Sequence, residues 1–221
     1  MKVAFPLLVA GFLAVLVVLD VALVWWSPSP NGLAAVAVIL AAVSGLPGLV
    51  WSGLGPRLAR DLILLASGFG LGAAISALPV MGPAAIGGTD LSTAILRGTG
   101  FLTIRVDALA AVFVAATSLV AGAATVFGSG YWTEPEQPQA RWTRGFFGLC
   151  VAGILGVEVA GDLVTFLVAW EVMTLSAFVL IATTHRQAET RKTAWLYMAS
   201  TRFATLALFL TICTGCSVGP N

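Results

Sequence analysis

Glu171 is the residue whose surroundings call for a chemical explanation. It lies at the centre of LVTFLVAWEVMTLSAFVLIAT, residues 163–183, and is the single charge in that apolar stretch. The stretch is long enough to cross a bilayer. A carboxylate at that depth is expensive, and ionisable groups inside membrane helices usually mark a path for protons or ions. The residue type and its position therefore predict a proton-responsive acid.

Arg202 is the candidate partner of this acid. It lies near the middle of the next apolar segment, 193–214, and a short polar loop joins the two segments. At about 1.5 Å per helical residue, Glu171 and Arg202 lie roughly 20 and 17 Å from that loop, which is a similar depth. A carboxylate whose cationic partner moves changes its affinity for protons. We interpret the pair as a proton-translocation element; a buried ion pair that only fixes helix packing is the alternative.

Three further residues are candidates to support this element. Thr174 lies three residues after Glu171, on roughly the same helical face, and could hydrate or hydrogen-bond the carboxylate. Asp107 opens another apolar segment, where a helix cap is the favoured interpretation. His185, the single histidine, heads the polar loop that follows the Glu171 segment. It could relay protons, although a surface histidine is the simpler interpretation.

Two other acids receive structural interpretations. Asp162 opens the segment that carries Glu171, and a negative charge is favourable at a helix N-terminus. Glu158 ends the preceding apolar segment, 145–159, and we expect it to be solvated near the non-cytoplasmic surface. Neither residue is assigned a part in proton movement.

No cofactor or metal site is expected. Cys150 lies inside an apolar segment, where a buried, inert thiol is usual. Cys213 and Cys216 form a lone C-x-x-C, which is weak evidence for metal or redox chemistry without a second pair. The sequence contains no Gly-rich nucleotide loop after a strand and no cysteine cluster for iron and sulfur.

A membrane is needed to position these residues. Of the 221 residues, 59% are hydrophobic and 10% are charged, and the mean hydropathy is +1.00. Soluble domains carry about 25% charged residues. Backbone groups in lipid must be satisfied within their own segment, so we expect an all-α integral membrane protein. Its apolar segments predict about seven transmembrane helices, at residues 3–26, 32–52, 62–80, 106–130, 145–159, 162–184 and 193–214.

The connections carry three further expectations. Residues 81–105 are Gly-rich, then alternate loosely, and predict a short extramembrane β-hairpin before the fourth helix. Residues 53–61 and 131–144 are predicted to be polar links. Small residues in 67–74 and 110–125 predict close packing of the third and fourth helices.

The distribution of basic residues predicts the orientation. With seven crossings, one side of the membrane receives eight basic residues and the other receives two. Because basic residues accumulate on the cytoplasmic side, we expect the N-terminus in the cytoplasm of a multi-pass protein of the cell inner (plasma) membrane. The eight are Lys2, Arg57, Arg60, Arg141, Arg144, Arg186, Arg191 and Lys192, and the two are Arg97 and Arg105.

The segment around Glu171 resembles a known family. With its flanks RGFFGLCVAGILGVEVAGD and TRKTAWLYMASTRFATLALFL, it is similar to the antiporter-like membrane subunits of respiratory complex I and their relatives. These relatives include the large membrane subunit of group 4 hydrogenases (formate hydrogenlyase and hydrogenase-4 types) and the Mrp sodium/proton antiporters. Trp170 and Glu171 match the family's W-E pair, and LTIRVDALAAVFV (102–114) is similar to the family's hairpin-to-helix stretch, with Asp107 at its Asp position. WEVMTLSAF is closer to the hydrogenase type and TRFAT, which holds Arg202, to the complex I type, so the subfamily stays open.

The resemblance covers roughly residues 95–213. It implies that Glu171 is the family's glutamate, whose charge state is coupled to proton movement and whose partner there is a lysine on a later, broken helix. Family members have about fourteen helices with two inverted repeats, so seven helices correspond to the N-terminal part of such a subunit. We divide the chain into membrane helices and loop at 1–94, the start of an antiporter-like domain at 95–214, and a short tail at 215–221.

Three functions follow from this reading, and all stay open. The first is a proton-translocating subunit, or an N-terminal fragment of one, in a membrane-bound complex of the NADH–quinone oxidoreductase or hydrogenase type. Its partners would be other membrane and peripheral subunits, which would hold the redox centres. The alternatives are a subunit of a Na⁺/H⁺ antiporter and a structural or truncated membrane protein without transport. A net charge of +1 gives no indication of a nucleic-acid partner.

Overall fold

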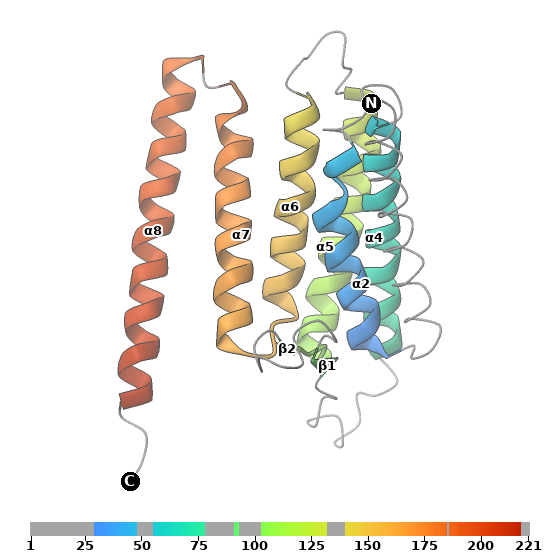
Figure 1. The fold of residues 1–221 in the computed structure, drawn as a ribbon, viewed down its shortest axis with the longest axis vertical. Helices are drawn as coiled ribbons and strands as arrows, with labels where there is room; N and C mark the ends of the chain where they lie inside the picture. The colour runs from blue at the N-terminus through green and yellow to red at the C-terminus, as the bar shows by residue number, and fades with distance from the viewer. Residues whose placement is uncertain are drawn as a thin grey trace, which may run out of the picture.

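The chain forms a bundle of helices that run up and down along a common direction (Figure 1). The computed structural model describes residues 29–47, 55–77, 91–92, 103–131, 140–184 and 186–217. The predicted first segment, 3–26, lies outside the described residues. The helices are α2 (Pro30–Val43), α4 (Gly55–Ala77), α5 (Ala108–Tyr131), α6 (Ala140–Glu158), α7 (Leu163–Ile181) and α8 (Ala188–Ser217), with a 3₁₀ turn at Ala182–Thr184 before α8.

The bundle has the composition of a membrane protein. Among the described residues, α4, α5 and α7 are long and apolar enough to cross a membrane, and α2 is apolar but shorter. Each of these helices satisfies its own backbone groups, as lipid requires. The expected all-α membrane fold is therefore confirmed, and the count of seven crossings stays a prediction.

Two predicted links prove to be partly helical. α4 begins at Gly55, inside the predicted link 53–61, and α6 begins at Ala140, inside the predicted link 131–144. Pro56 lies in the first turn of α4, where its missing N–H would have no helical partner in any case. The predictions were wrong there because hydropathy marks where a lipid-compatible stretch begins, whereas a helix can continue past that point with long charged side chains.

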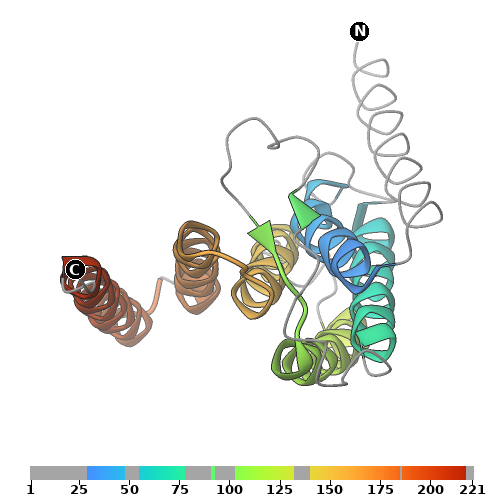
Figure 2. The ribbon, with the colours of Figure 1, turned by 90° about the horizontal axis from the view of Figure 1, so that it is seen from below.

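The helices divide into a row and a cluster. α8, α7 and α6 stand side by side, while α2, α4 and α5 gather on the far side of α6 (Figure 2). The most extensive helix contact is between α6 and α7, followed by α4 with α5 and α2 with α4. The core lies where α2, α4, α5 and α6 meet, and its largest fully buried side chains include Leu40, Val114 and Leu155. α8 packs chiefly on α7 and on the turn between them.

The expected packing of α4 on α5 through small residues is confirmed. A β-carbon added at Gly70 would lie 2.1 Å from Ser118 Oγ, so the two helices approach too closely there for any larger residue. Gly122 faces Ser67 less tightly, because a hypothetical β-carbon would lie 3.5 Å from its hydroxyl, which is an ordinary van der Waals contact. Small side chains let helix backbones approach and gain van der Waals contact.

A small antiparallel ladder closes one end of the bundle. β1 (Leu91–Ser92) pairs with β2 (Thr103–Ile104), so that Leu91 is opposite Ile104 and Ser92 is opposite Thr103. The strand pairing expected before the fourth predicted helix is thus present, two residues long on each side. The α6–α7 connection extends the ladder, because Ile104 also bridges to Ala160.

Candidate functional site

α7 carries Glu171 and begins at a well-defined cap. Asp162 has extended backbone dihedrals, and its Oδ1 accepts the N–H of Thr165 at 2.8 Å. An acidic side chain at this position satisfies a backbone donor that has no partner inside the helix. The apolar run that follows continues to Ile181 without a glycine or proline. Glu171 therefore lies near the middle of an unbroken helix.

Glu171 pairs with Arg202 across the α7–α8 contact. Arg202 Nη1 donates to Glu171 Oε2, and the side chains of Arg202 and Glu171 are 39% and 32% exposed on this chain. The pair therefore lies at an open edge of the bundle and not in its core. The other two polar ends, Glu171 Oε1 and Arg202 Nη2, are buried and have no hydrogen-bond partner within the described part of the chain. The two charges thus meet through a single hydrogen bond, and Arg202 Nε also donates to Met198 Sδ on its own helix at 3.5 Å.

A second polar contact supports the same helix pair. Trp170 Nε1 donates to Thr205 Oγ1 at 3.2 Å, one residue before Glu171 on α7 and three after Arg202 on α8. The Trp170 ring also stacks on Phe166, with 5.8 Å between centroids. The sequence reading identified the Trp–Glu pair as a motif but gave Trp170 no contact. The spacing of Arg202 and Thr205, which places both on one face of α8, could have indicated it.

α6 holds α7 from the opposite side. A β-carbon added at Gly153 would lie 2.6 Å from the backbone nitrogen of Met173, and one added at Gly156 would lie 2.9 Å from the β-carbon of Ala169. Both contacts flank Glu171 along the helix. The acid is thus carried by a helix that is closely packed on α6, whereas its cation belongs to α8.

The comparison with protein families identifies this region. Residues 160–215 match the model of the membrane part of NADH:quinone oxidoreductase and Mrp antiporter proteins. The resemblance seen around Trp170 and Glu171 is confirmed. These residues are similar to the membrane part of that family. The antiporter-family segment, residues 160–215, contains α7, the 3₁₀ turn and nearly all of α8, and therefore both members of the ion pair.

Two curated relatives come from Mycobacterium tuberculosis. They are Uncharacterized protein Rv0083 of strain ATCC 25618 / H37Rv and Uncharacterized protein MT0090 of strain CDC 1551 / Oshkosh. Each is 29% identical to this chain over 107 residues, which is 48% of this chain and 16% of the relative. The match therefore spans about one sixth of the length of these relatives.

Within the antiporter-family segment, Thr174 does not act as expected. It is buried, at 3% exposure, and its Oγ1 donates at 3.2 Å to the backbone carbonyl of Glu171. The expected hydrogen bond to the carboxylate is not formed. A threonine inside a helix commonly turns its hydroxyl to a carbonyl of the preceding turn, and this local bond is the one that Thr174 makes.

Asp107 does not bond to the Glu171–Arg202 pair, and His185 lies outside the described residues. Asp107 is exposed at the start of α5, and its Oδ1 accepts the N–H of Ala110 at 2.7 Å. The structure thus places it as a helix cap, and this side-chain hydrogen bond does not connect it to Glu171. His185 lies outside the described residues, so its expected role stays a prediction.

Glu158 is not a solvated surface residue, and the sequence prediction was wrong. The residue is half-buried at the end of α6, and its Oε1 accepts the Thr117 hydroxyl from α5. Its Oε2 is buried without a hydrogen-bond partner among the described residues. The end of an apolar segment was taken as the membrane surface, whereas the neighbouring helix α5 extends past it and covers the side chain.

Asp162 does more than cap α7. Its Oδ2 also accepts the Thr103 N–H at 2.6 Å and the Thr103 hydroxyl at 2.7 Å, and so connects β2 to α7. Partial burial acts to raise the pKa of Asp162, but the hydrogen bonds from Thr165 and Thr103 outweigh it and hold this pKa well below its ordinary value. The helix cap at Asp162 was predictable from the sequence. Its contact with Thr103, 59 residues away, follows from no local pattern.

The described residues offer no evident metal site. No three or more His, Cys, Asp or Glu side chains lie together among the residues that the structure describes. Cys150 is a free cysteine on α6. The side chains of Cys213 and Cys216 lie outside the described residues, so their C-x-x-C stays without a structural account.

Proposed function

We propose that this chain is a proton-translocating membrane subunit, or part of one, in a membrane-bound complex of the NADH–quinone oxidoreductase or hydrogenase type. One observation carries the proposal. Glu171 and Arg202 pair across two apolar helices inside the antiporter-family segment, and within the described residues each keeps a buried polar atom without a hydrogen-bond partner. Ionisable groups in membrane helices usually belong to an ion or proton path.

The pair can take up and release a proton when the distance between Glu171 and Arg202 changes. A guanidinium beside a carboxylate favours the charged form of the acid, and desolvation favours the neutral form. When Arg202 moves away from Glu171, the acid is left in an apolar contact and takes up a proton. When Arg202 returns, the proton leaves. The unpartnered Glu171 Oε1 is the acceptor atom at which a proton or a bridging water would arrive.

Arg202 takes the place of the family lysine in this account. The resemblance implies a lysine on a later helix as the partner of the glutamate, and Arg202 lies on the helix immediately after α7. Because the guanidinium stays protonated at physiological pH, it acts by moving its charge, and Glu171 is the group that gains and loses the proton.

The wider arrangement is part of the same proposal. We place the protein as a multi-pass protein of the plasma membrane, with its N-terminus in the cytoplasm and residues 95–214 as the antiporter-like domain. Redox centres belong to partner subunits. The arrangement of charges supports this orientation: the starts of α4, α6 and α8 and the α7–α8 turn lie at one end of the bundle, and they carry Arg57, Arg60, Arg144, Arg186, Arg191 and Lys192.

The test is proton movement in vesicles from cells that carry the variant in place of the native chain. We expect Glu171→Gln to lower proton flux about 100-fold, since a positioned proton-transfer group typically contributes at least that factor. Glu189→Gln is the matched control, because Glu189 is an exposed acid in the first turn of α8. Assembly with partner subunits is checked by co-purification of the intact complex.

The outcomes separate the three functions. Flux that is lost in Glu171→Gln, unchanged in Glu189→Gln and independent of sodium supports a proton-translocating subunit. Flux that requires sodium identifies the antiporter, which the family description also names. Native flux in Glu171→Gln, in a complex that assembles normally, leaves the chain with a structural role and refutes the proposal.

A further inference from the structure

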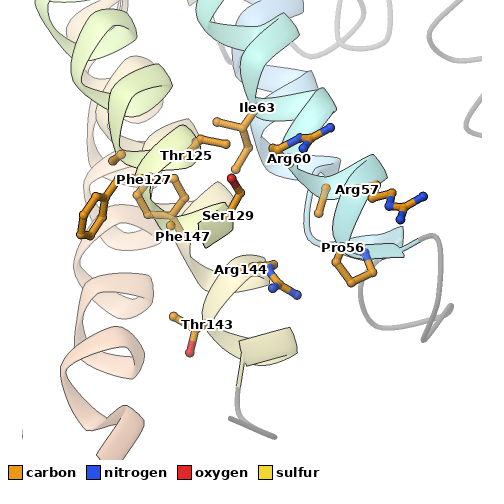
Figure 3. A pocket seen from close by; sticks show the side chains of 13 residues that line it. Pro56, Arg57, Arg60, Ile63, Thr125, Phe127, Ser129, Thr143, Arg144 and Phe147 are labelled. Atoms are coloured by element: carbon orange, nitrogen blue, oxygen red, sulfur yellow. The ribbon is translucent and has the colours of Figure 1, made fainter. Parts of the chain in front are cut away.

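A cavity of about 450 Å³ opens between the starts of α4 and α6 and the end of α5. Its inner wall is apolar and is formed by Ala59, Ile63 and Phe147. Thr125 and Ser129 of α5 add hydroxyl groups. Figure 3 shows Ile63 and Phe147 on one side of the view and the nitrogen-bearing ends of the arginines on the other. The cavity is thus amphipathic.

Among the residues that the structure describes, its lining carries basic side chains and no acidic one. Arg57 and Arg60 come from the first two turns of α4, and Arg144 comes from the start of α6. Arg60 also pairs with Asp61 at 2.8 Å, outside the lining. The N-termini of two helices add partial positive charge at the same place. Guanidinium groups and helix N-termini are the groups that bind phosphate oxygens.

The cavity lies at the depth of lipid headgroups. It belongs to the end of the bundle that carries the basic residues, next to the last turns of α5. Phe127 and Tyr131 stack there, with 5.9 Å between ring centroids, and both are largely exposed. Exposed aromatic residues of this kind collect at the membrane–water interface. A ligand that reaches the cavity from this side has its polar part in the interface and its apolar part in the bilayer.

We propose that this cavity binds the headgroup of an anionic phospholipid. The phosphate lies against Arg57 and Arg144, which approach from two different helices, and the first acyl carbons lie along Ile63 and Phe147. Basic recesses between membrane helices on the cytoplasmic side suit such lipids. A free phosphate would use the arginines but not the apolar wall, so the lipid fits the whole cavity better.

The test uses the full chain, purified in detergent and titrated with phosphatidylglycerol. We expect the lipid to raise the melting temperature and to bind with a dissociation constant that rises about 25-fold in Arg57→Gln/Arg144→Gln, or about fivefold for each arginine. Arg186→Gln is the matched control, because Arg186 is an exposed arginine at the same end of the bundle but outside the cavity. Its dissociation constant is expected to change less than twofold.

Several arms make the result decisive. Phosphatidylcholine should not reproduce the effect, and inorganic phosphate at equal concentration should not raise the melting temperature. The proposal is overturned if phosphate alone gives the full shift, or if Arg186→Gln weakens binding as much as the double variant. If the double variant does not fold, as judged by circular dichroism, Ala124→Phe tests the cavity with all arginines kept: unchanged lipid affinity in that variant also overturns the proposal.

Discussion

At the scale of single residues, the candidate site is a pair of opposite charges that meet through a single hydrogen bond. Arg202 Nη1 donates to Glu171 Oε2, while Oε1 and Nη2 are buried without partners in the described chain. A buried polar atom without a hydrogen bond costs free energy. A pair selected only for stability would be expected to use both of its ends in a bidentate contact. The single hydrogen bond therefore leaves each side chain able to bond to another partner, which suits an exchanging pair better than a purely structural one.

The first prediction at this scale concerns Asp162. Asp162→Ala removes the cap of α7 and its bonds to Thr103 and Thr165. We expect the free energy of unfolding to fall by about 1–2 kcal/mol at pH 7. Asp107→Ala, which removes an exposed cap of α5, is the control and should cost less. The measurement is denaturant unfolding in detergent micelles followed by circular dichroism.

The pH dependence of this effect has a definite sign. Hydrogen bonds lower the pKa of Asp162 in the folded chain below its ordinary value. The stabilisation is therefore fully present above the unfolded pKa of about 4, and it is lost as the pH falls from there toward the lowered folded pKa. The native chain and Asp162→Ala should converge in stability below about pH 4. A difference that stays constant from pH 7 to pH 3 would show that the carboxylate charge contributes nothing.

At the scale of elements, α6 determines the position of α7. Gly153→Ala places a methyl group within 2.6 Å of the Met173 nitrogen, two residues after Glu171. We expect this overpacking to lower the free energy of unfolding by about 1–3 kcal/mol. Because α7 must shift, we also expect proton flux to fall. Gly68→Ala is the control: nothing lies within 4 Å of its added β-carbon, and alanine favours a helix by up to about 1 kcal/mol. Equal stability in the two variants would contradict the close contact.

The positions of the helices could be predicted from the sequence more reliably than the residues at which the helices begin and the contacts between them. The centres of the described helices follow from apolar length, because a long apolar segment satisfies its own backbone groups in lipid by forming a helix. Gly55 and Ala140 begin their helices earlier than the apolar stretches indicate, since hydropathy marks the lipid boundary and not the first helical hydrogen bond.

Contacts between distant residues could be predicted only where a short loop joins the two helices. The depths of Glu171 and Arg202 could be counted from a shared loop, and their pairing was predicted correctly. The Thr103–Asp162 contact and the burial of Glu158 depend on how separate helices stack. No local pattern encodes that stacking, and both were missed.

At the scale of the whole molecule, charge is concentrated at one end of the bundle, and this gives a prediction about orientation. In a background without native cysteines, Gln187→Cys lies in the α7–α8 turn and Ala108→Cys lies at the opposite end, where α5 begins. We expect a membrane-impermeant maleimide to label Gln187→Cys only from the cytoplasmic side and Ala108→Cys only from the other. Reversed labelling would invert the proposed topology, and labelling of both from one side would contradict the crossing of α5 to α7.

The unequal attachment of the last two helices has a mechanical consequence. α7 is fastened to α6 through Gly153 and Gly156, whereas α8 rests chiefly on α7 and the turn before it. The contact between α7 and α8, which joins acid and cation, is thus the main attachment of α8 among the described helices, and it includes the Trp170–Thr205 hydrogen bond. A pivot of α8 about its first turn would part Arg202 from Glu171 and leave the other helices in place. A partner subunit that binds α8 would need to break only the contacts of α8 with α7 and with the turn before it.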